Sequence, residues 1–221
     1  MSKLTETLDK ILNWLEEHED LDFARFESLQ PGLTYKEIEQ KLTDLLPLRL
    51  PKEVYELYQW GNGAWYDEED WARFFDNRTF LSLESALDMY FGLTKLDKEA
   101  DKLEFPSMWS DTWNTRWFPI FQEQYNTGFY AVVLDEAQKE TTPVLDIFLE
   151  DCDDEPFIIY PSITKMILAE AELYESGYYL QKAELKQLSY DLQSRYRSAL
   201  DEEAKYIRQK YQDMHIKVWR Q

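Results

Sequence analysis

The stretch LPKEVYELYQWGNG, residues 50–63, predicts a short helix that ends in a glycine-rich turn. Pro51 suits the first position of a helix, because the N–H group that proline lacks would have no intrahelical acceptor there. Three apolar residues form the inward face of this helix: Val54, Leu57 and Tyr58. Gly61 or Gly63 can supply the left-handed residue that ends it.

A second stretch, YPSITKMI at residues 160–167, predicts a strand that runs through a proline straight into another helix. Ser162 can cap this helix, which ends near Gly177. Short runs rich in β-branched and aromatic residues lie before it and are typical of strands. The runs are Thr79–Leu83, Trp117–Phe121, Thr127–Leu134, Val144–Leu149 and Phe157–Tyr160, and a short helix is expected over Glu84–Tyr90. Their separation by turn-forming or acidic segments indicates an antiparallel meander.

Helices are predicted on both sides of these strands. Near the N-terminus, apolar residues recur at helical spacing: Leu4, Leu8, Ile11, Leu12 and Leu15. Thr34 and Glu37 form a capping-box pattern at the start of the next helix. Residues 181–212 read as one long helix with the stripe Leu185, Leu188, Leu192, Tyr196, Ala199, Glu203, Ile207 and Tyr211. The predicted fold class is α+β: a mainly antiparallel central sheet flanked by helices, with an N-terminal helix and a long C-terminal helical extension.

The 221 residues carry a net charge of −20, which is unevenly spread along the chain. Residues 1–180 carry 15 Lys and Arg against 38 Asp and Glu, whereas residues 181–221 carry 9 against 6. This change of sign predicts a boundary near residue 180. We therefore expect an N-terminal helical segment over residues 1–30, an α+β domain over residues 31–180 and a C-terminal helical extension over residues 181–221.

The composition also bounds the partners and the compartment. An acidic field of this size repels nucleic acid and anionic membranes and attracts basic partners. The longest apolar run, Phe129–Leu134, is far shorter than the roughly 18–20 residues that a membrane span needs. Cys152 is the only cysteine, so no intramolecular disulfide can form, which fits a reducing compartment. The N-terminus is acidic where a secretory signal would be apolar, so we expect a cytoplasmic protein.

Several short motifs, in their order and spacing, resemble the SUKH superfamily, the bacterial relatives of the fungal Smi/Knr cell-wall synthesis regulators. The motifs are Leu50–Pro51 with Tyr55, Tyr58 and Asn62–Gly63, then Phe80–Glu84, Phe118–Ile120, Tyr130–Asp135, Pro143–Val144 and Pro161–Ser162. The chain departs from the family pattern after Gly128, where an Asp is usual, and at Ile163, where an aromatic residue is usual. The resemblance covers roughly residues 34–177. It implies an α+β fold and protein binding, often as a toxin-neutralising immunity protein, and not catalysis.

Two acidic runs are the candidate partner-binding surface. The first is Trp65, Tyr66, Asp67, Glu68, Glu69, Asp70 and Trp71, in which acids would attract a basic partner and aromatic rings would anchor it. It can equally be an acidic loop whose tryptophans turn into the core. The second run, residues 150–155, contributes Asp151, Asp153 and Asp154. It lacks the central glycine and the distant glutamate of a calcium-binding EF-hand loop, so a solvated hairpin turn is favoured. If the two runs lie close together, they form one anionic surface that imitates a phosphate backbone.

The sequence predicts no catalytic residue, no metal ligand and no cofactor. His18 and His215 lie among charged residues, without further ligands at metal-binding spacing. Cys152 sits among carboxylates, whose field disfavours a reactive thiolate. There is no Gly-x-Ser-x-Gly motif, no phosphate-binding glycine loop and no dinucleotide fingerprint.

The leading hypothesis is therefore a non-enzymatic protein-binding module, immunity-like or regulatory, that binds a basic or polar protein partner such as a toxin domain. The first alternative is a carboxylate-based hydrolase. The second is a structural oligomer built through residues 181–212, and both a monomer and a homodimer stay open. Because that segment is basic, we favour its folding back on the acidic body over a role in dimerising or in partner binding.

Overall fold

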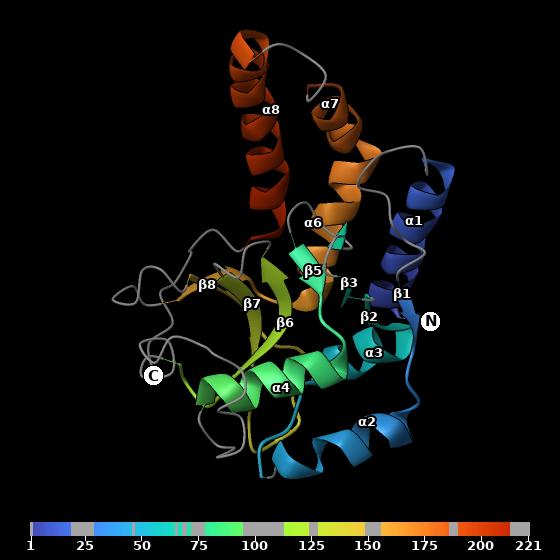
Figure 1. Ribbon diagram of the computed structural model, residues 1–221, viewed down its shortest axis with the longest axis vertical. Coiled ribbons are helices and arrows are strands. Elements are labelled where there is room, and N and C mark those ends of the chain that lie inside the picture. Colours follow the sequence, from blue (N-terminus) through green and yellow to red (C-terminus); the bar gives the residue numbers. More distant parts are fainter. Residues whose placement is uncertain are drawn as a thin grey trace.

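The computed structural model of the protein describes residues 2–18, 29–45, 47–64, 66–67, 70–71, 78–94, 113–123, 128–148, 156–185 and 190–212. These residues form an α+β fold, as predicted (Figure 1). The first half comprises α1 (Lys3–Glu17), β1 (Leu29–Pro31), α2 (Tyr35–Lys41), the 3-10 helix η2 (Leu42–Leu45), α3 (Lys52–Trp60), β2 (Gly61–Ala64), β3 (Tyr66–Asp67), β4 (Asp70–Trp71), β5 (Arg78–Phe80) and α4 (Leu83–Thr94). The second half comprises β6 (Trp117–Glu123), β7 (Gly128–Val133), β8 (Val144–Phe148), β9 (Phe157–Tyr160), α6 (Ile163–Glu175), α7 (Tyr178–Leu185) and α8 (Tyr190–Tyr211).

The central sheet is an antiparallel meander with the strand order β5–β6–β7–β8–β9. This confirms the meander predicted from the short apolar runs. Side chains alternate between the two faces of a strand, so the sheet contributes to two cores. Phe118 and Val132 belong to the main core, on what we call the helix face of the sheet. Phe129 and Ala131 point the other way into a smaller core that also contains Trp113.

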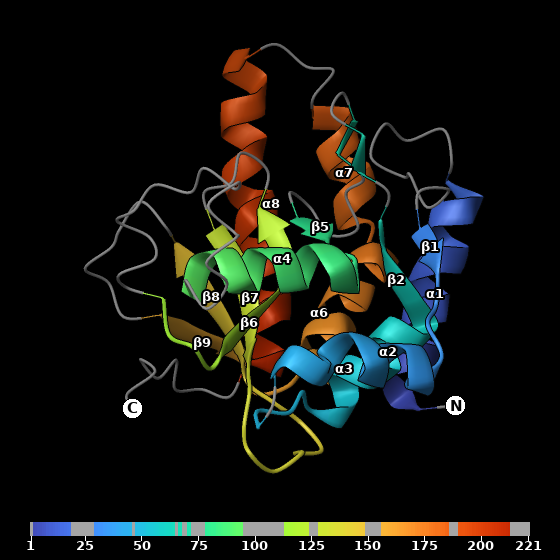
Figure 2. The same ribbon diagram turned by 60° about the horizontal axis from the view of Figure 1, so that its bottom comes forward.

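Helix α6 lies at the centre of the helical layer and packs against α1, α3, α7 and α8. Figure 2 shows α1 and α8 on opposite sides of it. The predicted N-terminal stripe is confirmed, because α1 buries Leu4, Leu8, Ile11 and Leu15 in the main core. The capping box of Thr34 and Glu37 at the start of α2 is confirmed as well.

The two ends of α3 differ from the prediction. Pro51 occupies the N-cap position and not the first helical position. The N–H groups of Lys52 and Glu53, which have no acceptor within α3, donate to the backbone carbonyl groups of residues 139 and 140. At the other end, Gly61 is extended, with φ −160°, so α3 passes directly into β2. The left-handed residue is Gly63, with φ 74°, two positions later.

The single helix predicted over residues 181–212 is wrong. The structure has two helices in this region, α7 and α8, which pack against each other (Figure 1). The predicted apolar stripe is wrong at Tyr196, Ala199 and Glu203, which are exposed, but Ile207 is buried in the main core, and Leu185 and Tyr211 pack against it. The residues that α8 buries in the main core are Leu200, Ala204 and Ile207. The extension thus folds back on the body, and the division at residue 180, which falls inside α7, stays a prediction.

Candidate functional site

Helix α3 connects the layers of the fold through residues at its two ends. Near its start, Glu53 is buried and its carboxylate accepts hydrogen bonds from the backbone N–H groups of Ile163 (3.2 Å) and Thr164 (3.1 Å). These are the first two residues of α6, whose N-terminal N–H groups have no acceptor within their own helix. Ser162 accepts a third bond, from the N–H of Lys165, as predicted for the helix cap. Glu53 therefore fixes the start of α6 from a distant part of the chain.

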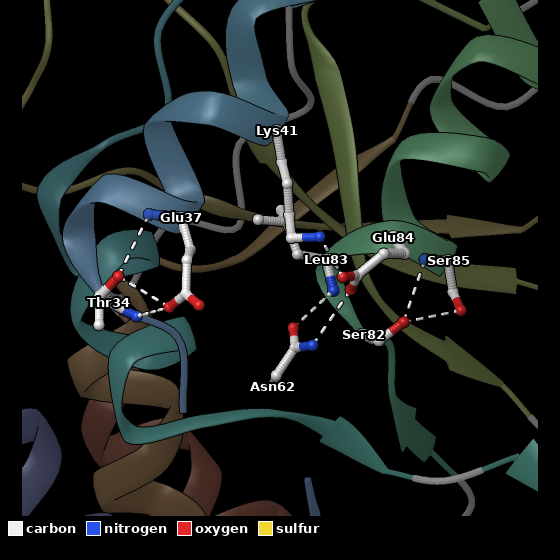
Figure 3. Close-up of polar contacts among 8 residues, drawn as sticks. All are labelled: Thr34, Glu37, Lys41, Asn62, Ser82, Leu83, Glu84 and Ser85. Carbon is white, nitrogen blue, oxygen red and sulfur yellow. Dashed lines mark hydrogen bonds and ion pairs between the residues drawn. The ribbon is translucent and has the colours of Figure 1, made fainter. Parts of the chain in front are cut away.

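Just beyond the other end of α3, Asn62 does the same for α4 (Figure 3). Its side-chain oxygen accepts from the N–H of Leu83 (3.0 Å), and its amide nitrogen donates to Glu84 (3.1 Å). Lys41 of α2 pairs with the other oxygen of Glu84 at 2.5 Å. Burial opposes ionisation of Glu84, but the bonds from Lys41 and Asn62 outweigh it and lower the pKa of that carboxyl group. The turn after α3 thus joins α2, β2 and α4.

Gly63 completes this turn. Its φ of 74° is unfavourable for residues with a side chain, and a Cβ atom there would lie 2.3 Å from the backbone nitrogen of Ser82. Strand β2, which contains Gly63, can therefore approach the backbone just before α4 only with glycine at this position. Asn62 and Gly63 thus have a structural role: the side chain of Asn62 is hydrogen-bonded within the chain, and Gly63 provides the backbone conformation.

We expect Asn62→Ala to lower the free energy of unfolding by about 1–3 kcal/mol, because it leaves the buried N–H of Leu83 without an acceptor. Asn62→Asp keeps the acceptor but sets a second carboxylate against Glu84, so it should also destabilise. Equilibrium denaturant unfolding of the two variants measures both effects. The idea fails if Asn62→Ala unfolds at the same denaturant concentration as the parent.

One end of the central sheet gathers charged and aromatic residues. The register pairs Arg78 with Glu123, Gly128 with Phe148, and Asp146 with Phe157. The termini of all five strands therefore meet at this end, which we call the β8–β9 end. In the sequence, the second acidic run, residues 150–155, stands between β8 and β9 and lies outside the described residues.

An ion pair crosses the helix face at the β8–β9 end. Arg78 of the edge strand β5 lies over the ring of Tyr130, with its guanidinium carbon 3.5 Å from the ring centroid, and reaches Asp146 of β8 at 3.4 Å. The side chains of Arg78 and Asp146 are only 11% and 15% exposed. Burial raises the pKa of Asp146 to about 6; Arg78 opposes this and Glu123 adds to it. Burial thus outweighs the favourable effect of Arg78 on the ionised carboxylate.

Two large apolar side chains stay exposed beside this ion pair. Phe148 is 46% exposed and Phe157 is 40% exposed. Phe157 of β9 pairs directly with Asp146 of β8, and Phe148 is two residues after Asp146 in the same strand. All three side chains therefore lie on the helix face. Solvent-exposed phenyl rings next to a charged pair are typical of binding surfaces.

A second polar cluster holds α8 on α6. The buried Glu170 of α6 accepts from the hydroxyl group of Tyr179 at 2.7 Å and pairs with Arg208 of α8 at 3.5 Å. Two residues further along α6, Glu172 pairs with Lys210 and accepts a hydrogen bond from the hydroxyl group of Tyr211. The bond from Lys210 is the main reason that the pKa of Glu172 is lowered. These pairs engage Arg208 and Lys210, two of the nine basic residues of the extension, within the molecule.

The predicted site residues fall mostly outside the described part of the chain. Trp65, Glu68, Glu69, Asp151, Asp153 and Asp154 all lie there. The backbone of Tyr66, Asp67, Asp70 and Trp71 forms the β3–β4 hairpin, in which Tyr66 pairs with Trp71 and Asp67 with Asp70. The residues that the sequence reasoning missed are Arg78, Tyr130, Asp146, Phe148 and Phe157. A charge at Asp146, within the otherwise apolar β8, is the signal that could have revealed them.

Within the described ranges, no group of three or more His, Cys, Asp or Glu residues could hold a metal ion. His18 donates from Nδ1 to the backbone oxygen of Trp14 at 2.8 Å and stacks on the ring of Trp14. His215 and Cys152 lie outside those ranges. A search of the described helices for one that is long and apolar enough to cross a bilayer finds none.

The fold is thus an α+β domain in which a meander sheet and its helices are joined through α3 and the turn after it. The family comparison supports this description: a family model described as the SMI1 / KNR4 family (SUKH-1) matches residues 32–169. The chain belongs to this family, as the resemblance implied. The match begins before α2 and ends within α6, so it includes Glu53, Asn62, Gly63 and the central sheet. A search of curated proteins gives no match.

Proposed function

We propose that the protein is a non-enzymatic protein-binding module, immunity-like or regulatory, that acts on a basic protein partner in the cytoplasm. Membership of the SUKH family fits this role, since these domains are generally immunity or regulatory domains associated with protein partners such as toxins. The partner class follows from charge, because a net charge of −20 attracts basic surfaces and repels acidic ones.

The observation that carries this proposal is the β8–β9 end of the sheet. Exposed phenyl rings supply area that a partner can desolvate, and the adjoining acidic run can attract a basic surface. In the sequence, residues 150–155 stand between Phe148 and Phe157, and we propose that the apolar and the acidic residues act together. The run from Trp65 to Trp71 is proposed as a second part of the partner surface.

The test begins with an affinity pull-down of the tagged protein, followed by mass spectrometry and direct binding measurements with the purified partner. We expect the rate of association to fall about threefold to tenfold when Asp67, Glu68, Glu69 and Asp70 become Asn or Gln, because steering charges act mainly on association. Added salt should slow association in the parent for the same reason. Surface plasmon resonance measures both rates.

The matched control removes four charges elsewhere, from the exposed Glu16, Glu17, Glu202 and Glu203 by replacement with Gln. It should change the rate of association much less. Association that ignores both salt and the site variant would contradict the proposal. Turnover in a panel of esterase, glycosidase, phosphatase and nuclease substrates, lost in Asp146→Asn, would favour the carboxylate-based hydrolase instead.

The structure favours the structural-oligomer hypothesis less than the protein-binding hypothesis. The residues of α8 that are buried face α6 and the rest of the main core, so they are already used within the chain. Light scattering of the full chain distinguishes this alternative, because a self-associating chain would increase in mass with concentration.

A further inference from the structure

The central sheet has two edge strands, β5 and β9, and their outer sides differ. β5 lies beside β2, which also approaches the backbone just after β5, at Ser82. In the described part of the chain, β9 hydrogen-bonds to β8 on one side and to no strand on the other. An edge strand of this kind presents unpaired N–H and carbonyl groups to its surroundings.

The strand register shows which residues turn their main chain toward which neighbour. Thr142, just before β8, accepts a bond from the N–H of Val133 at 2.9 Å and donates to its carbonyl oxygen at 3.4 Å. Val133 of β7 therefore turns its main chain toward β8. This direction alternates along an antiparallel strand, so Ala131, two residues earlier, also faces β8. Leu145, which pairs with Ala131, faces back toward β7.

The same alternation continues into β9. Asp146 follows Leu145 and so turns its main chain toward β9, and Phe157, which pairs with Asp146, faces back toward β8. Ile158 then directs its N–H and carbonyl groups away from the sheet, and neither group bonds to another residue in the described ranges. Pro156, two residues earlier, has no N–H group, and sheets accept proline where the N–H would face outward from an edge.

Apolar side chains stay partly exposed on both faces of this edge. Phe157, which is 40% exposed, lies on the helix face with the exposed Phe148. Ile158 is half-buried and packs against the smaller core on the opposite face, and Ile159 is half-buried against the main core. Successive residues of an added strand would point to opposite faces, so the strand would cover apolar surface on both.

We propose that the outer side of β9, centred on Ile158, binds an extended segment of the basic partner as an added strand; this rests on the proposed function. An extended chain carries main-chain groups at the spacing of an edge strand, and its alternate side chains supply specificity. Residues 1–180 carry 38 acids against 15 bases, so Lys or Arg in that segment is favoured and a second copy of this chain is disfavoured. The bulge in the β8–β9 pairing and Pro161 after it limit the added strand to a few residues.

The first measurement is amide hydrogen exchange in the full-length ¹⁵N-labelled protein, followed by NMR. In the free protein, the amide of Ile158 should exchange at least about tenfold faster than that of Phe157, because only the second faces β8. The probe is the peptide acetyl-Lys-Val-Thr-Val-Thr-Lys-amide. At saturation it should slow exchange at Ile158 about tenfold or more and leave Phe157 within about twofold.

Methylation of the peptide main chain separates strand pairing from side-chain contact. N-methyl groups on all four central residues remove the donors on both edges of the peptide, so the Kd should rise about tenfold or more. N-methyl groups on the two valines alone leave one edge free to pair, and the Kd should stay within about threefold of the parent peptide's.

Two protein variants test the side-chain contribution. Phe157→Thr keeps a residue that suits a strand but removes the ring, and should raise the Kd about threefold or more. Tyr206→Thr is the matched control on the outer side of α8, where the ring is 66% exposed, and should leave the Kd within about twofold. Thermal unfolding of each variant checks that the fold is retained.

The outcomes separate the added strand from the basic partner. If the lysine peptide binds without slowing exchange at Ile158, the strand site is wrong while the basic-partner hypothesis stands. If a peptide with Glu in place of both Lys residues protects Ile158 equally well, the strand site stands and the basic-partner hypothesis is wrong. If neither peptide binds, the strand site is wrong.

Protection of Ile158 in the free protein would also overturn the proposal, because the edge would then be occupied already. Protection that is lost in Val218→Pro would identify this chain's own C-terminal segment as the occupant, since proline cannot donate to a sheet. Protection that grows with protein concentration would identify a second copy.

Discussion

Replacing Glu53 by Ala is expected to lower the free energy of unfolding by about 2–5 kcal/mol, which is a large part of the stability of a typical domain. The substitution leaves the N–H groups of Ile163 and Thr164 without their acceptor, and the first of these is buried. It also removes a negative charge from the positive end of the α6 dipole. Because α6 packs against four other helices, its displacement should spread through the main core. Denaturant unfolding followed by tryptophan fluorescence measures the loss.

Glu53→Gln supplies a graded comparison. One carbonyl oxygen remains as acceptor, so about half of the lost stability should return, while the charge contribution stays absent. Glu136→Gln is the control for charge alone, since that side chain is exposed. Equal unfolding midpoints for Glu53→Ala and Glu136→Gln would show that Glu53 does not hold α6 in place.

The helices and strands that the sequence predicted correctly rest on local signals. Ser162 caps α6, Thr34 and Glu37 form the capping box of α2, and the short apolar runs become the strands of the meander. In each case the deciding residues lie within a few positions of the element that they define. Consecutive strands with short connections pair with each other, so topology followed from order.

Contacts between distant parts of the chain could not be predicted in the same way. Glu53 reads as an acid in the first turn of a short helix, which is a common position, yet its partner is 110 residues away. Arg78 and Asp146 lie 68 residues apart, and they meet because β6 and β7 bring β5 and β8 to one face. The sequence contains both residues of each pair but not the sheet register that places them together.

The extension shows a different kind of error. The prediction of one apolar stripe from residue 185 to residue 211 required a single helix with the same buried face along its whole length. The chain instead forms two helices, α7 and α8, and the buried face of one is independent of that of the other. The face of α8 that is buried places Leu200 in the core and Arg208 at Glu170. A stripe through Glu203 would have buried a charge without a partner, which is unfavourable.

Removal of α8, in a chain that ends at Leu185, is expected to lower the free energy of unfolding by about 3–6 kcal/mol. The loss has two sources. Leu200 and Ile207 are buried in the main core, and such side chains contribute about 1.5–3 kcal/mol each when buried. Glu170 also loses Arg208 and would keep one bond, from Tyr179, in a buried setting. Denaturant unfolding of the shortened chain, followed by circular dichroism, gives the value.

Point variants test the same contact without deleting a helix. Leu200→Ala should cost about 2–4 kcal/mol, since it opens a cavity in the main core. Tyr206→Ala is the matched control on the outer side of α8, where the side chain is 66% exposed, and its effect should stay within about 0.5 kcal/mol. If the chain ending at Leu185 keeps the midpoint and the steepness of the full-length transition, residues after the boundary form the separable unit that the charge pattern predicted. If Leu200→Ala and the shortened chain both lose stability, α8 is part of the core, and its apolar contacts rather than its exposed ion pairs hold it there.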